Sequence, residues 1–163
     1  PEQFLGLLER IRTLAPNAGV RSNVIVGFPG ETDADVQTLV DFVSEARLDA
    51  LGVFAYSDEE GTEGVALPDH VDDDVIAERY ERLSTLANDL VEARADERMG
   101  ERVQVLIEGR DERGAVGRAE HQGPDVDGSV SIEDAAGRLA VGELVWGRVT
   151  ATDGADLIVE RER

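Results

Sequence analysis

A strand–helix–strand pattern near the start of the chain is the strongest constraint on its fold. Residues 20–26 are rich in β-branched residues and hold a continuous Val-Ile-Val run, which predicts a strand buried on both faces. An amphipathic helix follows, and Thr32 and Asp35 have the spacing of a capping box at its start. Residues 51–56 (LGVFAY) predict a second buried strand. This order predicts two parallel strands joined by a right-handed helical crossover.

The rest of the chain divides into helical segments and a run of short strands. Apolar spacing predicts a helix over residues 4–14 and a long helix that ends near Gly100. After Gly100, five short strand-like segments are separated by Gly, Asp and Pro turns, which is typical of a small antiparallel β-barrel. We therefore predict an α/β plus all-β chain, with an α/β part at 1–71, a linking helix at 72–99 and a β-barrel domain at 100–163.

The charge balance bears on partners more than on fold. The chain has 36 acidic and 16 basic residues, a net charge of −20, and all the basic residues are Arg. Such a negative field repels nucleic acid and attracts basic proteins. There are no cysteines and only two histidines, far apart in sequence, so neither a thiolate nor a His-based metal site is expected within this chain. We accordingly predict no metal ligands here.

The chain has no feature that would direct it to a membrane. No apolar run approaches the roughly 18–20 residues of a membrane-spanning helix, and the start PEQFLGLLER is not a signal peptide. We predict a cytoplasmic protein with no membrane partner. The sequence opens inside an expected helix without an initiator Met, which indicates a part of a longer polypeptide.

The segment GFPGE at 27–31 is a candidate binding site, because functional groups gather at the C-terminal ends of parallel strands. Gly27 would allow a flat ligand to approach the backbone, and Pro29-Gly30 would shape a tight turn. Backbone N–H groups at the following helix start would be available to a ligand. The acidic segment that begins at Tyr56 should lie on the same rim. An ordinary strand-to-helix turn would use the same residues.

Residues 21–32 (RSNVIVGFPGET) and 54–62 (FAYSDEEGT) together resemble the radical S-adenosylmethionine methylthiotransferases, and the predicted barrel resembles their TRAM domain, which is OB-like. The resemblance implies the C-terminal half of a radical-SAM partial (β/α) barrel followed by TRAM. It implies S-adenosylmethionine as cofactor, and 4Fe–4S clusters whose cysteine ligands lie outside this chain. The fragment should therefore be inactive alone, with no catalytic residue of its own.

The same resemblance places residues along the cofactor. The residues implied to line it are Ile25, Val26, Gly27, Phe28, Gly30, Tyr56 and Ser57. Glu31 is interpreted as structural, whereas Arg21 could either border the site or form a salt bridge.

The resemblance extends to two branches of the family, which modify different substrates. The tRNA-modifying branch has Tyr-Ser-x-Arg-Pro-Gly-Thr where this chain has Glu59-Glu60 in place of Arg-Pro. Residues 124–128 (PDVDG) resemble the Pro-Glu-Ile-Asp-Gly stretch of the ribosomal-protein branch, which methylthiolates an aspartate of a basic small-subunit protein. Charge, rim loop and this motif favour that basic protein over tRNA as the partner. A purely protein-binding module is the alternative from another class.

We predict a docking surface for the basic partner on the TRAM domain and the rim. The acidic residues assigned to it are Asp58, Glu59, Glu60, Asp125 and Asp127. Turn chemistry would equally explain the two aspartates in PDVDG. Trp146 is interpreted as core or barrel-edge packing rather than a base-stacking platform. The best feature for RNA binding is a strip of arginines on the barrel whose charge nearby acids largely cancel: Arg102, Arg110, Arg113 and Arg118.

Overall fold

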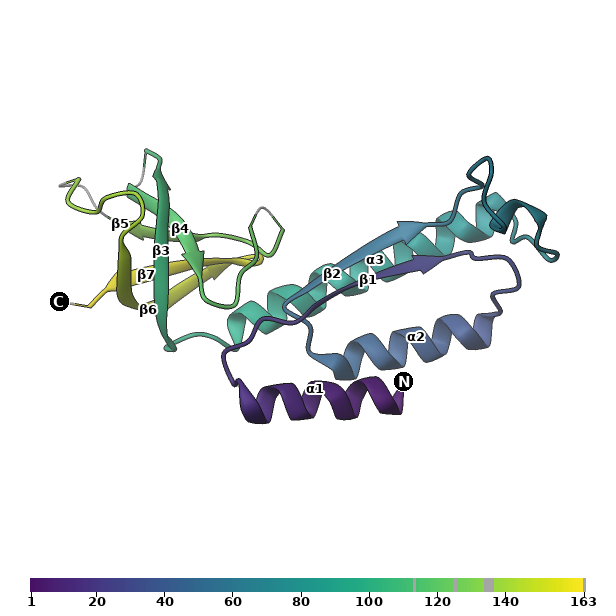
Figure 1. Ribbon diagram of the computed structural model, residues 1–163, viewed down its shortest axis with the longest axis horizontal. Coiled ribbons are helices and arrows are strands. Elements are labelled where there is room, and N and C mark those ends of the chain that lie inside the picture. Colours follow the sequence, from purple (N-terminus) through teal and green to yellow (C-terminus); the bar gives the residue numbers. More distant parts are fainter. Residues whose placement is uncertain (113, 125, 134–136, 163) are drawn as a thin grey trace.

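The computed structural model describes residues 1–112, 114–124, 126–133 and 137–162, and it consists of a small α/β unit and a β-barrel (Figure 1). In the α/β unit the elements are α1 (Glu2–Leu14), β1 (Arg21–Val26), α2 (Asp33–Ala46), β2 (Ala50–Ala55), the short 3-10 helix η1 (Gly64–Ala66) and α3 (Asp73–Asp96). The barrel strands are β3 (Arg102–Arg110), β4 (Gly114–Ala119), β5 (Val130–Glu133), β6 (Leu144–Asp153) and β7 (Asp156–Arg161).

The predicted parallel unit is confirmed. β1 and β2 pair in parallel over their whole lengths, and α2 is the crossover between them. The Thr32–Asp35 capping box is present: each residue's side chain accepts a hydrogen bond from the other's backbone N–H. This cap fixes the point at which the chain leaves the turn after β1 and enters the helix.

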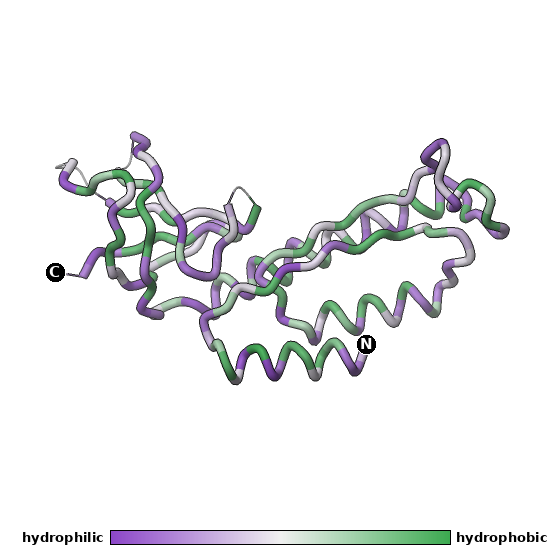
Figure 2. The backbone as a smooth tube through the Cα atoms, viewed as in Figure 1, coloured by the Kyte–Doolittle hydropathy of each residue, from purple (hydrophilic) through white to green (hydrophobic). Residues whose placement is uncertain are grey.

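The sheet is buried on one face only, which corrects the two-sided burial predicted from the Val-Ile-Val run. Val26 is 0% exposed and packs with Val43 of α2 and Leu83 of α3. Ile25 points the other way and is 55% exposed, as is its cross-strand neighbour Phe54 at 53%. No described element covers that second face. Figure 2 shows the apolar stretches along both strands.

The predicted barrel is confirmed as a closed ring of five strands in the order β3-β4-β5-β7-β6, but it is not wholly antiparallel. β5 and β7 pair in parallel, and the other four pairings are antiparallel. Directions cannot alternate around a closed ring with an odd number of strands, so one parallel pair is unavoidable. The core contains mainly valine, isoleucine and leucine side chains, among them the fully buried Val105, Ile107 and Leu157.

Helix α3 contributes to the hydrophobic core of the barrel and to the one beneath the sheet. Leu83 packs against the sheet, whereas Ala95 at the other end belongs to the barrel core. At about 1.5 Å per residue, its 24 residues span roughly 36 Å. The predicted division at residues 71 and 99 stays a prediction, and α3 does more than connect the two parts.

Buried charged groups join the barrel to the α/β unit. Asp49, just before β2, accepts a hydrogen bond from Arg98 (2.5 Å) and one from the backbone N–H of Val20 (2.9 Å). His121, in the connection between β4 and β5, is also buried here. A Cβ on Gly19 would lie 1.9 Å from the carbonyl oxygen of His121, so only glycine permits this close approach.

The environment of His121 predicts a pH effect on stability. Burial, and then Arg98 and Arg94, lower the pKa of His121 to about 4, and the nearby Asp49 and Asp127 only partly oppose this. The unfolded imidazole titrates near its ordinary value of about 6.5. Between these values the unfolded state holds more protons, so stability should fall as pH drops from about 6.5 to 4, by at most about 3 kcal/mol.

Urea unfolding of the parent chain and His121→Gln across pH 4–7 measures this contribution. Carboxylates add their own pH dependence to both proteins, so the predicted quantity is a shallower slope in His121→Gln. Thr38→Ala, an exposed substitution on α2 that removes no titratable group, is the control and should keep the parent slope. Equal slopes for the parent and His121→Gln would contradict the assignment.

Candidate functional site

The turn after β1 and the loop after β2 lie side by side, as the parallel pairing predicts. The rings of Phe28 and Tyr56 meet edge to face with centroids 5.2 Å apart. The backbone N–H of Tyr56 donates to the carbonyl of Val26 (2.8 Å), and that of Gly30 donates to the carbonyl of Asp69 (2.8 Å). We call residues 27–31 and 56–70 the rim. In Figure 1 it lies at the end of the sheet away from the barrel.

Glu31 fixes the shape of the rim. Its Oε1 accepts hydrogen bonds from the backbone N–H of Gly27 (2.9 Å) and from Arg79 of α3 (2.8 Å). Its side chain is nearly buried, and Arg79 also bonds Asp33 (2.6 Å). These contacts support the structural interpretation of Glu31. Gly27 itself has φ +81, and a Cβ there would lie 2.5 Å from Ile76 Cγ1, so the turn requires glycine.

The residues predicted to line a cofactor fall into two groups. Ile25, Phe28, Gly30 and Ser57 are exposed and Tyr56 is half-buried, whereas Val26 and Gly27 are buried. Val26 therefore has no apolar surface to offer a ligand, because its side chain points into the core. Phe54, which the sequence analysis did not single out, shares the open face with Ile25. The sequence signal for it was its place in LGVFAY, the segment predicted to pair with residues 20–26, and the structure sets it opposite Ile25.

Several backbone donors between the end of β1 and the start of α2 are already used within the chain. The N–H groups of Gly27 and Thr32 donate to the carboxylates of Glu31 and Asp35. That of Glu31 donates to the carbonyl of Phe28. These three N–H groups are therefore engaged, and the expectation of ligand-binding backbone donors at the helix start stays a prediction for Asp33 and Ala34, the first residues of α2. The accessible features here are the apolar face around Ile25 and Phe54 and the ring of Phe28.

Asp58 is held within the rim loop by two aromatic neighbours. Its Oδ1 accepts a hydrogen bond from the Tyr56 hydroxyl (3.0 Å) and lies 3.8 Å from His70 Nε2. Burial and this hydrogen bond raise the pKa of Tyr56. His70, which sequence reasoning missed, also lies 3.2 Å from the carbonyl of Gly64 and so ties the two sides of the loop. Sequence spacing gave no signal for this role.

Asp127 does not belong with the rim acids. It is only 8% exposed, its Oδ2 accepts the N–H of Gly123 (2.7 Å), and its Oδ1 lies 3.7 Å from Arg21. Arg21 opens β1, so Asp127 lies near the start of the strand whose end forms the rim, roughly 20 Å away for six residues. Burial and this separation correct its placement on a shared docking surface, and Arg21 forms the salt bridge considered for it. Asp125 lies outside the described residues.

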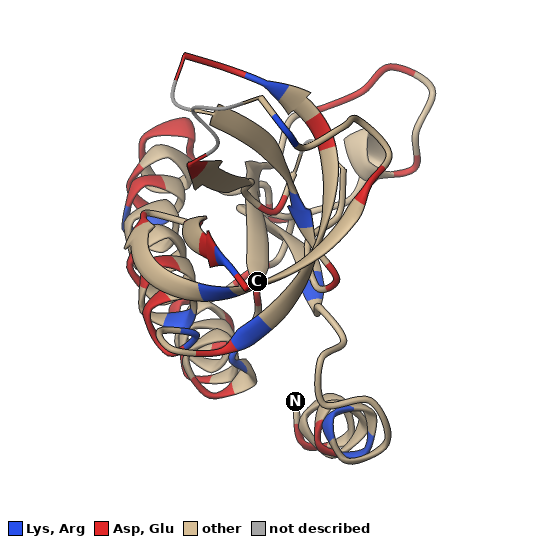
Figure 3. Ribbon diagram, turned by 90° about the vertical axis from the view of Figure 1, so that its left-hand side faces the viewer, with Lys and Arg blue, Asp and Glu red and all other residues tan. Residues whose placement is uncertain are grey.

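The barrel surface carries balanced charge. Trp146 is 39% exposed on the outer wall, with the Arg102 guanidinium 4.0 Å from its ring centre, so it is not a core residue. Arg102 also pairs with Glu162 (2.6 Å), and Arg118 pairs with Glu108 (3.0 Å). Arg113 lies outside the described residues. In Figure 3, which faces the barrel, basic and acidic segments alternate. The described part of the arginine strip is thus largely neutralised.

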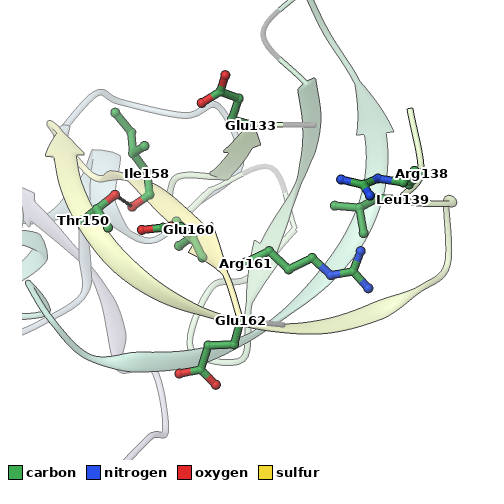
Figure 4. Close-up of a pocket in the computed structure, with 9 residues that line it drawn as sticks. Glu133, Arg138, Leu139, Thr150, Ile158, Glu160, Arg161 and Glu162 are labelled. Carbon is green, nitrogen blue, oxygen red and sulfur yellow. Dashed lines mark hydrogen bonds between the residues drawn. The ribbon is translucent and has the colours of Figure 1, made fainter. Parts of the chain in front are cut away.

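A groove of about 660 Å³ lies on the barrel wall rather than at the rim (Figure 4). Three carboxylates and two guanidinium groups line it, together with Leu139, Thr150, Ile158 and Val159; the charged residues are Glu133, Glu160, Glu162, Arg138 and Arg161. This mixture selects neither an anionic nor a cationic ligand. We therefore keep the rim as the candidate site. Among the described residues, no group of three or more His, Asp or Glu is placed to hold a metal ion.

Comparison with known proteins agrees with this architecture. Residues 99–161 match the TRAM domain family. Over nearly its whole length the chain is similar to proteins named ribosomal protein uS12 methylthiotransferase RimO. It is 58% identical to the one from Saccharopolyspora erythraea over 97% of the chain, 56% to that of Streptomyces avermitilis over 98%, and 54% to that of Cutibacterium acnes over 96%.

The chain is a relative of the RimO proteins. It spans about a third of the length of these curated relatives, 32% in each of the three. The resemblance to the ribosomal-protein branch of the methylthiotransferases is therefore confirmed. The match to the TRAM domain family covers β3 to β7, so the barrel on which Trp146 lies is the TRAM domain. No described helix is both long and apolar enough to cross a membrane.

Two glycines of the rim allow a matched prediction. Gly27 and Gly30 both have positive φ, but only Gly27 has a side chain where a Cβ would lie. Gly30→Ala should cost about 1–2 kcal/mol from backbone strain alone. Gly27→Ala should cost roughly a further 1–3 kcal/mol, because the added methyl displaces Ile76. Urea unfolding measures both, with Gly6→Ala in the open face of α1 as control. Equal losses would contradict the packing argument.

Proposed function

We propose that the chain is part of a radical S-adenosylmethionine methylthiotransferase that modifies an aspartate of ribosomal protein uS12. In this proposal the α/β unit is the C-terminal half of a partial (β/α) barrel, and its open sheet face is the barrel interior. The observation that supports it most is the pairing of two strand-end loops beside an exposed apolar face. The names of the relatives, which are uS12 methylthiotransferases, support the reaction and the substrate.

S-adenosylmethionine fits the exposed part of the rim. Ile25 and Phe28 would contact the adenine, with Tyr56 and Ser57 at the neighbouring strand end and Gly30 at the edge of the turn. Gly27 and Val26 are buried, so they would support the site by fixing the turn and the strand rather than by contacting the cofactor. When bound beside a 4Fe–4S cluster, this cofactor supplies radical chemistry, and this chain supplies walls and orientation.

The cluster does not fit this chain. Thiolates are the ligands such clusters require, and the sequence has no cysteine. In this proposal the cluster ligands belong to a longer polypeptide, and the 163-residue chain alone is inactive.

A basic protein fits the outer edge of the rim, where we place its docking site. Glu59 and Glu60 are exposed. The exposed carboxylate of Asp58 already interacts with Tyr56 and His70. It would therefore add negative charge to the rim rather than bind the partner directly. Single exposed pairs are worth about 0–1 kcal/mol, so the acids would act by steering. The TRAM domain, at the far end of the sheet, would contact a separate part of the partner.

The tRNA-modifying alternative has less support. Phosphate binding needs cations that are not already paired, and Arg102 and Arg118 each have a carboxylate partner. The rim has Glu59-Glu60 where that branch has Arg-Pro. The alternative from another class is a protein-binding module without catalysis. The activity measurement described below distinguishes it from the proposed enzyme.

Reversing the rim charge should slow association with uS12. In Glu59→Arg/Glu60→Arg the association rate at low salt should fall about tenfold, because long-range attraction is lost. Glu81→Arg/Asp89→Arg changes net charge equally on α3 and is the matched control. Stopped-flow binding at rising salt measures this. If both double variants slow equally, net charge and not the rim is responsible.

Activity is tested on the intact polypeptide from which this chain derives. Mass spectrometry of uS12 from cells with and without the gene should show a methylthio group on an aspartate only when the gene is present. Unmodified uS12 in both strains would contradict the proposal. A mobility shift of tRNA, without binding of uS12, would support the alternative branch.

A further inference from the structure

The junction between the sheet and the barrel contains buried charges where apolar contact would be the simpler solution. Four polar residues there are at least nine-tenths buried: Asp49, Arg98, His121 and Asp127. They come from the residue before β2, the turn after α3 and the β4–β5 connection. Side-chain desolvation makes such a cluster costly unless each group finds partners.

Asp49 is the centre of this cluster. Its Oδ2 accepts the N–H of Val20, which precedes β1. Its Oδ1 accepts a hydrogen bond from Arg98 and lies 3.3 Å from Arg94 Nε. One carboxylate therefore links the starts of both sheet strands to the end of α3, from which β3 and the barrel continue.

Three buried polar atoms, two in the cluster and one on the neighbouring Arg94, have no hydrogen-bond partner among the described residues. They are Arg94 Nε, His121 Nδ1 and Asp127 Oδ1. All three residues line one cavity of about 10 Å³. That volume is about one water molecule, and a buried water needs roughly 2–4 polar partners. Arg94 Nε is a hydrogen-bond donor, Asp127 Oδ1 is an acceptor, and His121 Nδ1 can be either, depending on its tautomer. One water molecule can hydrogen-bond to all three.

We propose that the Asp49 cluster is a polar joint, completed by one bound water in this cavity, that fixes the orientation of the barrel on the sheet. The water would bridge Arg94 on α3 to His121 and Asp127 on the barrel. Directional hydrogen bonds specify one arrangement, whereas a smooth apolar contact would permit sliding. Buried ion pairs of this kind add little net stability compared with apolar packing. The role we assign to the joint is therefore to fix the relative orientation of sheet and barrel, not to add free energy of unfolding.

The polar joint is independent of the proposed function, and its test needs only the 163-residue chain. Residual dipolar couplings measured by NMR report whether two parts of a molecule share one orientation. In the parent chain, couplings from the sheet and the barrel should fit a single alignment tensor. In Asp49→Asn, Arg98 loses its buried counter-charge, so the two parts should need separate tensors while each keeps its own fold.

Asp41→Asn is the matched control, because Asp41 is an exposed residue on α2 whose carboxylate accepts a hydrogen bond from Gln37, one turn earlier on the same helix. It should keep the single tensor. If Asp49→Asn folds poorly, Asp49→Asn/Arg98→Gln removes both charges, and Arg94 keeps Glu97 as partner (2.8 Å). A single tensor in either folded variant would overturn the joint.

The bound water is tested by a crystal structure that resolves ordered solvent. We expect one water within hydrogen-bonding distance of at least two of the atoms Arg94 Nε, His121 Nδ1 and Asp127 Oδ1. A dry cavity, or these atoms bonded to one another, would overturn that part of the proposal.

Discussion

The in-register parallel pairing of β1 and β2 is the constraint on which the candidate site depends. The ladder runs from Arg21 opposite Ala50 to Val26 opposite Ala55, and the Tyr56 N–H extends it by one more bond. Because both strands end together, the two loops that follow must share one edge. The contact of Phe28 with Tyr56 is a consequence of that pairing. A one-residue slip would turn Ile25 into the core and Val26 outward.

Local patterns in the sequence were enough to predict the elements. Thr32 and Asp35 are three residues apart, so their capping box forms within one turn of helix and needs no distant partner. The paired strands and the five-stranded barrel follow from short apolar runs between turn residues. Burial on both faces of the sheet was predicted wrongly, because an apolar Ile25 has the same sequence signal whether or not something covers it.

The errors at the site involve partners far apart in sequence. Asp127 occupies a turn motif whose local chemistry is the same when exposed or buried, and only the approach of Arg21 and α3 decides between these. His70 is held to Asp58 by the path of a long loop, which no periodicity describes. Glu31 was interpreted correctly as structural, but its hold on Gly27 depends on Arg79, 48 residues away.

Strand polarity also determines how the two parts can cooperate. The rim forms where β1 and β2 end, and the polar joint forms where they begin, so the barrel and the rim lie at opposite ends of the same sheet (Figure 1). α3 runs between them, with Ile76 against the rim turn and Ala95 in the barrel core. A partner that touches both ends must therefore be extended over at least the length of the strands. For such a partner the fixed angle between sheet and barrel matters as much as either contact surface, because a small rotation at the joint moves the barrel surface through a large distance relative to the rim.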